Sequence, residues 1–178
     1  MTVQDAYLAA WRFAAEAHRA QQLPGTELPY LVHVGAVAME VVVAHHEHAF
    51  ARPELAVQCA LLHDTLEDTA TSEAELVARF GADVAAGVRA LSKDKGLAKP
   101  EAMADSLRRI RAQPAEVWAV KLADRITNLA PPPAHWSPGK IAAYRSEART
   151  ILDALGQAHA PLAARLARRI ASYPSGSA

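Results

Sequence analysis

The sequence predicts an all-α fold, a compact bundle of several helices. Apolar residues recur every three or four positions along most of the chain, as on the buried face of a helix, and no stretch shows the alternation typical of a strand. Alanine, a strong helix former, is abundant. Proline and glycine gather between the periodic segments, where they end one helix and lead into the next.

Capping and breaking residues set the expected helix boundaries. A loop with Pro24 and Pro29 ends the first helix, and Pro53 suits the first turn of the third. Ser72, followed three residues later by Glu75, is a capping box that opens the fourth. The expected helices cover residues 3–20, a segment from 32 onward, 53–67, 72–81, 82–92, 100–112, 114–129, 140–155 and 161–171.

The C-terminal part of the chain is divided by the three consecutive prolines at 131–133. Proline disfavours helix at its own position and at the residue before it, so an extended break precedes the last two helices. The final helix, 161–171, alternates arginine with aliphatic residues, which is typical of an amphipathic helix. We therefore expect one domain over residues 1–173, followed by a disordered tail at 174–178.

Composition narrows the class of function. A chain of 178 residues that is 51% hydrophobic can enclose one sizeable core. Its 19 basic and 19 acidic residues balance to zero net charge, which argues against a nucleic-acid partner. No apolar run is long enough to cross a membrane, and the lone Cys59 lies in an apolar run. We expect a cytoplasmic protein with a buried thiol and no disulfide within the chain.

Four side chains from three separate segments form an H…HD…D pattern. They are His33, the adjacent pair His63 and Asp64, and Asp124. Any one of them alone is explained more simply as a core histidine, a helix cap or half of an ion pair. Together, two neutral imidazoles and two carboxylates suit a divalent transition metal that activates water.

The second of these segments carries further acidic groups. On a continuous helix, His63 would lie over Glu67, because residues four apart share one face. Asp64 would lie over Asp68 for the same reason. Carboxylates beside the apolar residues that precede them are costly unless a cation or hydrogen bonds compensate.

These motifs belong to a longer series of segments that match a known family. The segments are Ala17-His18 to Gln21, Pro29 to His33, HDTLEDT at 63–69, Ser92 to Lys95, VKLADRITNL at 120–129, and the surroundings of Tyr144. In this order they resemble the HD superfamily of metal-dependent phosphohydrolases, and more closely the hydrolase domain of RelA/SpoT-type enzymes and the single-domain small alarmone hydrolases. The resemblance covers nearly the whole chain. It implies an all-α HD-domain bundle and a divalent metal, usually Mn²⁺.

The resemblance also implies roles for individual residues. The implied metal ligands are His33, His63, Asp64 and Asp124. Glu67 and Asp68 match the acidic pair that orients or deprotonates the attacking water, and Asn128 matches an asparagine of the substrate site. The implied reaction is hydrolysis of the 3′-pyrophosphate of a purine alarmone, (p)ppGpp or (p)ppApp, with release of pyrophosphate.

A small purine nucleotide would also need cationic and aromatic partners. For its phosphates we expect Lys95, Lys99 and Lys140. Tyr144 is expected to stack on the nucleotide or to hydrogen-bond to it.

The stretch before His33 departs from the family pattern. Many alarmone hydrolases carry an Arg-Lys pair there, whose arginine can stack on guanine, whereas this chain has Leu23 and Pro24. Guanine and adenine alarmones therefore both stay open. One alternative is another HD-type nucleotide phosphatase, which would release orthophosphate from the 2′-phosphate of NADPH or from a nucleoside monophosphate. A second is a metal-binding module that senses a nucleotide without turnover.

Overall fold

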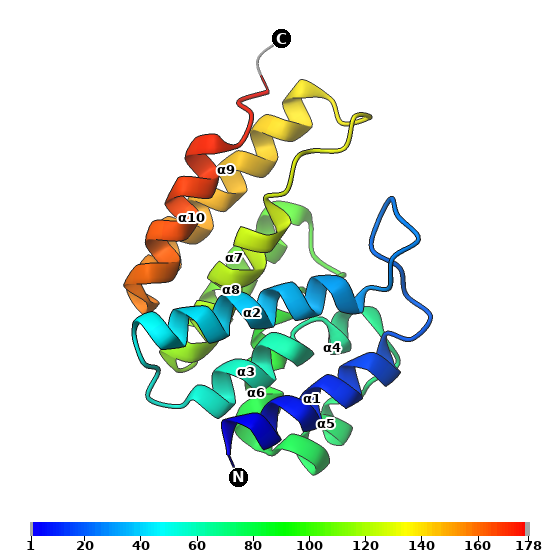
Figure 1. The fold of residues 1–178 in the computed structure, drawn as a ribbon. Coiled ribbons are helices and arrows are strands. Elements are labelled where there is room, and N and C mark those ends of the chain that lie inside the picture. Colours follow the sequence, from blue (N-terminus) through cyan, green and yellow to red (C-terminus); the bar gives the residue numbers. More distant parts are fainter. Residues whose placement is uncertain (1, 177–178) are drawn as a thin grey trace.

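The computed structural model describes residues 2–176 and confirms the all-α prediction (Figure 1). The helices are α1 (Val3–Ala17), α2 (Leu31–Glu47), α3 (Pro53–Leu62), α4 (Thr65–Asp68), α5 (Glu73–Phe80), α6 (Ala82–Leu91), α7 (Lys99–Arg111), α8 (Ala115–Asn128), α9 (Pro138–Leu155), the 3-10 turn η1 (Gly156–Ala158) and α10 (Ala160–Ser172). Within residues 2–176 no strand forms, and an isolated antiparallel bridge joins Gln22 to Pro29.

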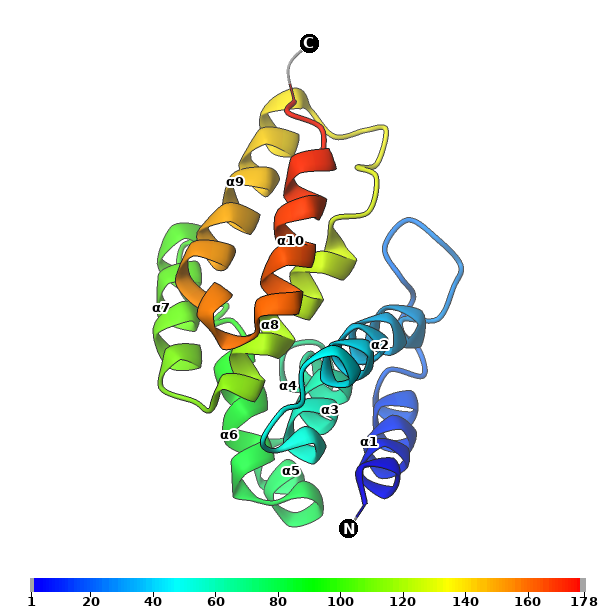
Figure 2. The same cartoon turned by 60° about the vertical axis from the view of Figure 1, so that its left-hand side comes forward.

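Helices α3 and α8 form the centre of the bundle. Every residue from Leu55 to Leu62 of α3 is buried, and α3 packs against α1, α2, α6 and α8. A helix that is apolar on all sides must be enclosed in this way. Helices α9 and α10 form an antiparallel pair that packs on α8 at one end of the molecule (Figure 2). The site described below lies where α2, α4 and α8 meet.

Several local predictions are confirmed by the capping contacts. The Ser72 hydroxyl accepts a hydrogen bond from the Glu75 backbone amide at the start of α5. Pro53 lies in the first turn of α3. Cys59 is a free, buried thiol. A side chain at Gly87 would place its Cβ 2.7 Å from the Cys59 sulfur, so glycine allows α6 to approach α3 closely.

The prediction of one continuous helix from 53 to 67 is wrong. The chain leaves helical hydrogen bonding at His63 and Asp64, which separate α3 from α4. The Thr65 hydroxyl donates to the Leu62 carbonyl oxygen at 2.7 Å, and a side-chain bond of this kind competes with the helical backbone pattern. The Asp68 amide still donates to the Asp64 carbonyl at 2.9 Å, so the turn that carries the acidic pair is retained.

Two helix boundaries differ from the prediction, and part of the predicted tail lies outside the described residues. Helix α1 ends at Ala17, three residues earlier than expected, and α9 begins two residues earlier, at Pro138, after the Ser137 cap. Residues 177–178 of the predicted disordered tail lie outside the described residues, so the tail stays a prediction. No helix in the described part has the length and apolarity required to span a bilayer.

Candidate metal centre and active site

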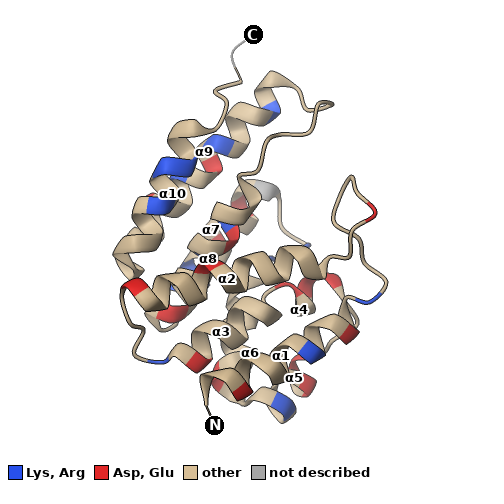
Figure 3. Ribbon diagram, in the orientation of Figure 1, with Lys and Arg blue, Asp and Glu red and all other residues tan. Residues whose placement is uncertain are grey.

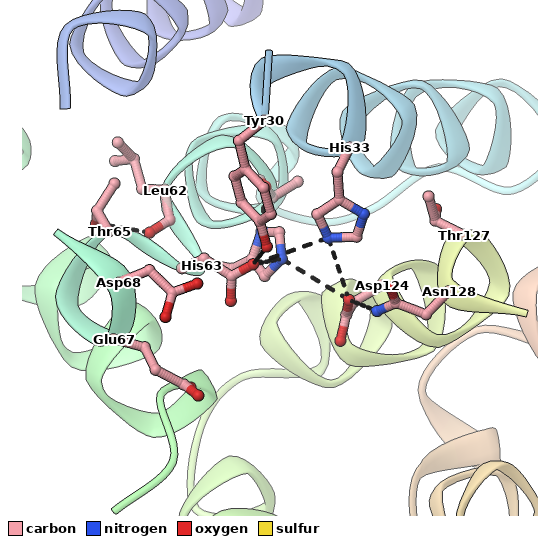
Figure 4. Close-up of polar contacts among 12 residues, drawn as sticks. Tyr30, His33, Leu62, His63, Thr65, Glu67, Asp68, Asp124, Thr127 and Asn128 are labelled. Atoms are coloured by element: carbon pink, nitrogen blue, oxygen red, sulfur yellow. Dashed lines mark hydrogen bonds and ion pairs between the residues drawn. The ribbon is translucent and has the colours of Figure 1, made fainter. Parts of the chain in front are cut away.

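The four predicted metal ligands come together from three parts of the fold, and Figure 4 labels three of them, His33, His63 and Asp124. His33 lies in the first turn of α2, His63 and Asp64 form the junction between α3 and α4, and Asp124 lies on α8. His33 Nε2 is 3.5 Å from Asp124 Oδ1 and 3.8 Å from Asp64 Oδ2. His63 Nε2 is 2.9 Å from Asp64 Oδ2 and 3.8 Å from Asp124 Oδ1. Residues 91 positions apart in sequence thus face one point.

This donor set fits a divalent metal ion. The ligand atoms of His33, His63 and Asp64 all lie within 4.8 Å of one another. His63 Nδ1 donates to the Ala60 carbonyl oxygen at 2.8 Å, which directs the Nε2 lone pair toward the carboxylates. That Nε2 is buried, and the polar group nearest to it is the Asp64 carboxylate, at 2.9 Å. A ring nitrogen facing two carboxylates suits either a metal ion between them or a proton on Nε2.

The pKa values of these groups show the same need for a cation. Burial lowers the pKa of His63, but the Asp64 and Asp124 carboxylates outweigh burial and raise it to about 9. Burial raises the pKa of Asp64, and the opposing effect of His63 leaves it well below its usual range. For Asp124 burial is likewise overcome, mainly by the Lys121 ammonium, and its pKa is well below the ordinary value. Without a metal, a proton on His63 takes the place of the cation.

The side chains of the acidic pair, Glu67 and Asp68, point in different directions (Figure 4). The Asp68 carboxylate points toward the ligand cluster in Figure 4 and accepts a hydrogen bond from Gln21 Nε2 at 3.3 Å. Glu67 points to the loop after α6, where its Oε2 accepts the Lys93 backbone amide at 2.8 Å. Lys95 Nζ donates to the Glu67 carbonyl oxygen and lies 3.7 Å from Asp68 Oδ1. Acidic residues gather on and beside α4, near the N-terminal end of α2 (Figure 3).

A mainly apolar cleft of about 480 Å³ opens beside His33. Its walls include Leu23, the prolines at 131–133, Trp136 and Tyr144, and none of the described residues that line it is Asp, Glu, Lys or Arg. Burial raises the pKa of Tyr144 to about 12, so its hydroxyl stays protonated. A neutral cleft of this kind suits the flat, apolar part of a ligand.

A second cavity, of about 340 Å³, adjoins the acidic pair and is charged. Glu67, Lys93, Asp94, Lys95 and Glu147 are among its lining residues. The ligand cluster therefore has an apolar cleft beside His33 and a charged cavity beside Glu67.

The HD domain family model matches residues 10–167. The chain belongs to the HD domain family. A protein from Danio rerio named guanosine-3′,5′-bis(diphosphate) 3′-pyrophosphohydrolase MESH1 is 35% identical over 159 residues, which cover 86% of each chain. The protein of the same name from Homo sapiens is 34% identical over 153 residues, covering 83% of each chain. A solved structure described as a metazoan ortholog of SpoT that hydrolyzes ppGpp superposes with a TM-score of 0.82 at 28% identity, over 96% of each chain.

Membership in the HD domain family implies a divalent metal, and His33, His63 and Asp64 form its possible site. The expected substrate residues of this HD domain are spread over its two cavities. Asn128 and Tyr144 line the apolar cleft, and Lys95 lines the charged cavity.

Two further predicted cations have different positions. The Lys140 ammonium lies 4.2 Å from the centre of the Trp136 ring, at the edge of the apolar cleft. The side chain of Lys99 lies outside the described residues.

Of the side chains that hold the candidate ligands in place, Tyr30 was not predicted from the sequence. Helical spacing places Lys121 and Asn128 on the same face as Asp124. The Tyr30 hydroxyl donates to Asp64 Oδ2 at 2.5 Å, across 34 positions of sequence, and no local pattern signals such a contact. Lys121 Nζ donates to Asp124 Oδ2 at 2.8 Å, and Asn128 Nδ2 donates to Asp124 Oδ1. The three- and four-residue spacing on α8 was the available signal for these two.

Proposed function

We propose that this HD domain protein hydrolyses the 3′-pyrophosphate of a purine alarmone, (p)ppGpp or (p)ppApp, and releases pyrophosphate. The observation that carries the proposal is the convergence of His33, His63, Asp64 and Asp124, with the Asp68 carboxylate pointing toward them (Figure 4). Relatives that match this chain over most of their own length carry the name of that activity, which supports the same reaction here.

The metal would be held by the two imidazoles and two carboxylates of the cluster, and we propose Mn²⁺ as the ion. A bound divalent cation neutralises phosphate charge and acidifies water. Tyr30 and Lys121 each occupy one oxygen of a ligating carboxylate, which fixes its orientation.

The two acidic residues would have different roles, with Asp68 handling the proton of the attacking water. Asp68 faces the ligand cluster and is placed to accept that proton. Glu67, tied to the Lys93 amide, would hold the loop that carries Lys95 against α4. Lys95 already lies between the two acidic residues, where it can pair with a phosphate oxygen.

The two cavities suggest how the nucleotide lies. The purine would enter the neutral cleft, against Trp136 and Tyr144, with Lys140 at its edge. The phosphates would extend toward the charged cavity that contains Lys93 and Lys95. This placement fits a small nucleotide, and with zero net charge we propose a cytoplasmic enzyme with no nucleic-acid or membrane partner.

An adenine alarmone is a second candidate substrate. The cleft offers no charged side chain among its described lining residues, and Leu23 stands where an arginine could stack on guanine. The prolines at 131–133 have no backbone N–H, so that wall gives the base carbonyl acceptors but no backbone donors. Both purines carry a donor amine, but guanine also has the O6 acceptor, which such a wall leaves without a backbone donor, whereas adenine has no carbonyl oxygen.

A nucleotide panel with added Mn²⁺ tests the proposal. It contains ppGpp, ppApp, NADPH and nucleoside monophosphates, and the products are separated by chromatography. Pyrophosphate from either alarmone supports the proposed reaction. Orthophosphate from NADPH or a monophosphate would favour the phosphatase alternative instead. Metal and nucleotide binding without any product would favour a sensing module.

A further inference from the structure

The side chain of Gln21 bridges two groups that the reaction itself does not connect. Its Oε1 lies 2.6 Å from Nδ1 of His18, and its Nε2 donates to Asp68 Oδ2 at 3.3 Å. His18 ends α1, whereas Asp68 ends α4, 47 positions beyond Gln21. One amide thus links the end of α1 to the acidic pair.

His18 and Asp68 together fix which way the Gln21 amide faces. The ring is only 2% exposed, and since Nδ1 meets the amide oxygen, Nδ1 must carry the hydrogen and donate it. The amide nitrogen then faces Asp68. The opposite orientation would place the amide oxygen against a carboxylate oxygen, which is repulsive. The Asp68 carboxylate therefore selects the arrangement in which Gln21 donates to it, and a donor on His18 Nδ1 completes that arrangement.

The backbone around Gln21 is held as firmly as its side chain. The Gln21 amide donates to the His18 carbonyl, and the Gln21 carbonyl accepts from the Tyr30 amide, both at 2.9 Å. The bridge between Gln22 and Pro29 closes the loop just beyond. The centres of the His18 and Tyr30 rings are 5.0 Å apart. Tyr30, which hydrogen-bonds to Asp64, therefore also packs against the His18 ring that contacts Gln21.

Asp68 has few other restraints. Its side chain is 33% exposed. Besides Gln21 it contacts Lys95, whose side chain is 69% exposed and therefore gives little restraint. It belongs to a helix of four residues, which gives little support of its own. A carboxylate in such a place needs a fixed partner to keep one orientation.

We propose that Gln21, clamped by His18, is a positioning residue that holds the Asp68 carboxylate toward the metal ligands. This inference rests on the proposed function, in which Asp68 accepts the proton of the attacking water. Gln21 does not touch the reacting atoms and acts through Asp68. Losing such a partner should lower kcat and leave KM and metal affinity nearly unchanged.

The test compares Gln21→Met with Gln22→Met in the full chain with Mn²⁺. Methionine has the length of glutamine without its polar atoms, and the exposed Gln22 side chain makes no hydrogen bond to a described residue. We expect Gln21→Met to lower kcat roughly 10- to 100-fold, the usual range for a partner that orients a site group. KM and the Kd for Mn²⁺, measured by calorimetry, should stay within about twofold of wild type, and Gln22→Met should match wild type throughout.

Two further comparisons separate positioning from support of the fold. His18→Asn keeps a donor near the Nδ1 position and should retain most of kcat, whereas His18→Leu should lose as much as Gln21→Met. In an Asp68→Asn background, Gln21→Met should cause no further loss, because the carboxylate that it positions is already gone. Thermal unfolding of each variant identifies any that fail to fold. If a His18 or Asp68 variant fails to fold, the comparison of Gln21→Met with Gln22→Met tests the positioning role.

The outcomes distinguish this inference from the proposed function. A wild-type protein that releases no pyrophosphate would refute the proposed function. An active wild type whose kcat is unchanged by Gln21→Met would refute the positioning role alone. A full additional loss in the Asp68→Asn background would also refute it, because Gln21 would then act independently of Asp68.

Discussion

Raising the pH from 6.5 to 9 should destabilise the metal-free protein through the titration of His63. Burial lowers the pKa of this imidazole, but the Asp64 and Asp124 carboxylates raise it from 6.5 in the unfolded chain to about 9 in the folded one. The folded state therefore keeps a proton that the unfolded state releases. The resulting stabilisation is complete below pH 6.5 and is lost as the pH rises through about 9.

The expected effect is a large fraction of the stability of a domain. A difference of one pKa unit corresponds to about 1.4 kcal/mol, so the rise from 6.5 to about 9 is worth about 3 kcal/mol. His63 is only 3% exposed, and solvent screening does little to reduce this value. Domains of this size are usually stable by about 5–15 kcal/mol.

Urea unfolding in the presence of a chelator, followed by circular dichroism across this pH interval, measures the effect. The matched control is His63→Asn, whose amide can still donate to the Ala60 carbonyl but does not titrate. The wild type should lose about 3 kcal/mol relative to this variant between the two pH values. Parallel curves for the two proteins would refute the reasoning. Added Mn²⁺ should stabilise the wild type more at the alkaline end, because the metal binds the neutral imidazole.

Three further substitutions test separate parts of the site. Asp64→Ala should abolish Mn²⁺ binding and turnover together, whereas Asp68→Asn should keep the Kd for Mn²⁺ and lower kcat by roughly 10²- to 10⁴-fold. Calorimetry and product release measure these, and full activity of Asp64→Ala would contradict the ligand assignment. Leu23→Arg should lower KM for ppGpp roughly two- to fivefold, the value of one cation–π contact at a partly exposed site. An unchanged KM would mean that the base is held away from this loop.

The order of helices could be predicted because it depends on local patterns, and the four candidate ligands could be named because their residue types suit a metal and match the HD superfamily. Helical periodicity and caps such as Ser72 depend on residues that lie within a few positions of one another in the sequence. The pairing of His63 with Asp64 in one motif, and the isolated His33 and Asp124, indicated a metal through their chemistry alone. The family model that matches residues 10–167 confirms the wider resemblance.

The parts that could not be predicted depend on contacts between distant segments. The bond from Tyr30 to Asp64, and the path from His18 through Gln21 to Asp68, join α1 and its following loop to α4. No spacing rule connects such positions. The different directions of Glu67 and Asp68 also depend on a distant segment, because the Lys93 amide draws Glu67 away.

The break between α3 and α4 affects what two neighbouring side chains can do together. Consecutive residues of an α-helix project about 100° apart, so an unbroken helix would turn the imidazole and the carboxylate of positions 63 and 64 to different sides. The break in helical hydrogen bonding there lets both side chains face His33 and Asp124, where a common ion would bind. A continuous helix at this place would have more complete backbone hydrogen bonding but would bind a metal ion less well. Selection for helix stability alone would therefore remove the candidate metal site.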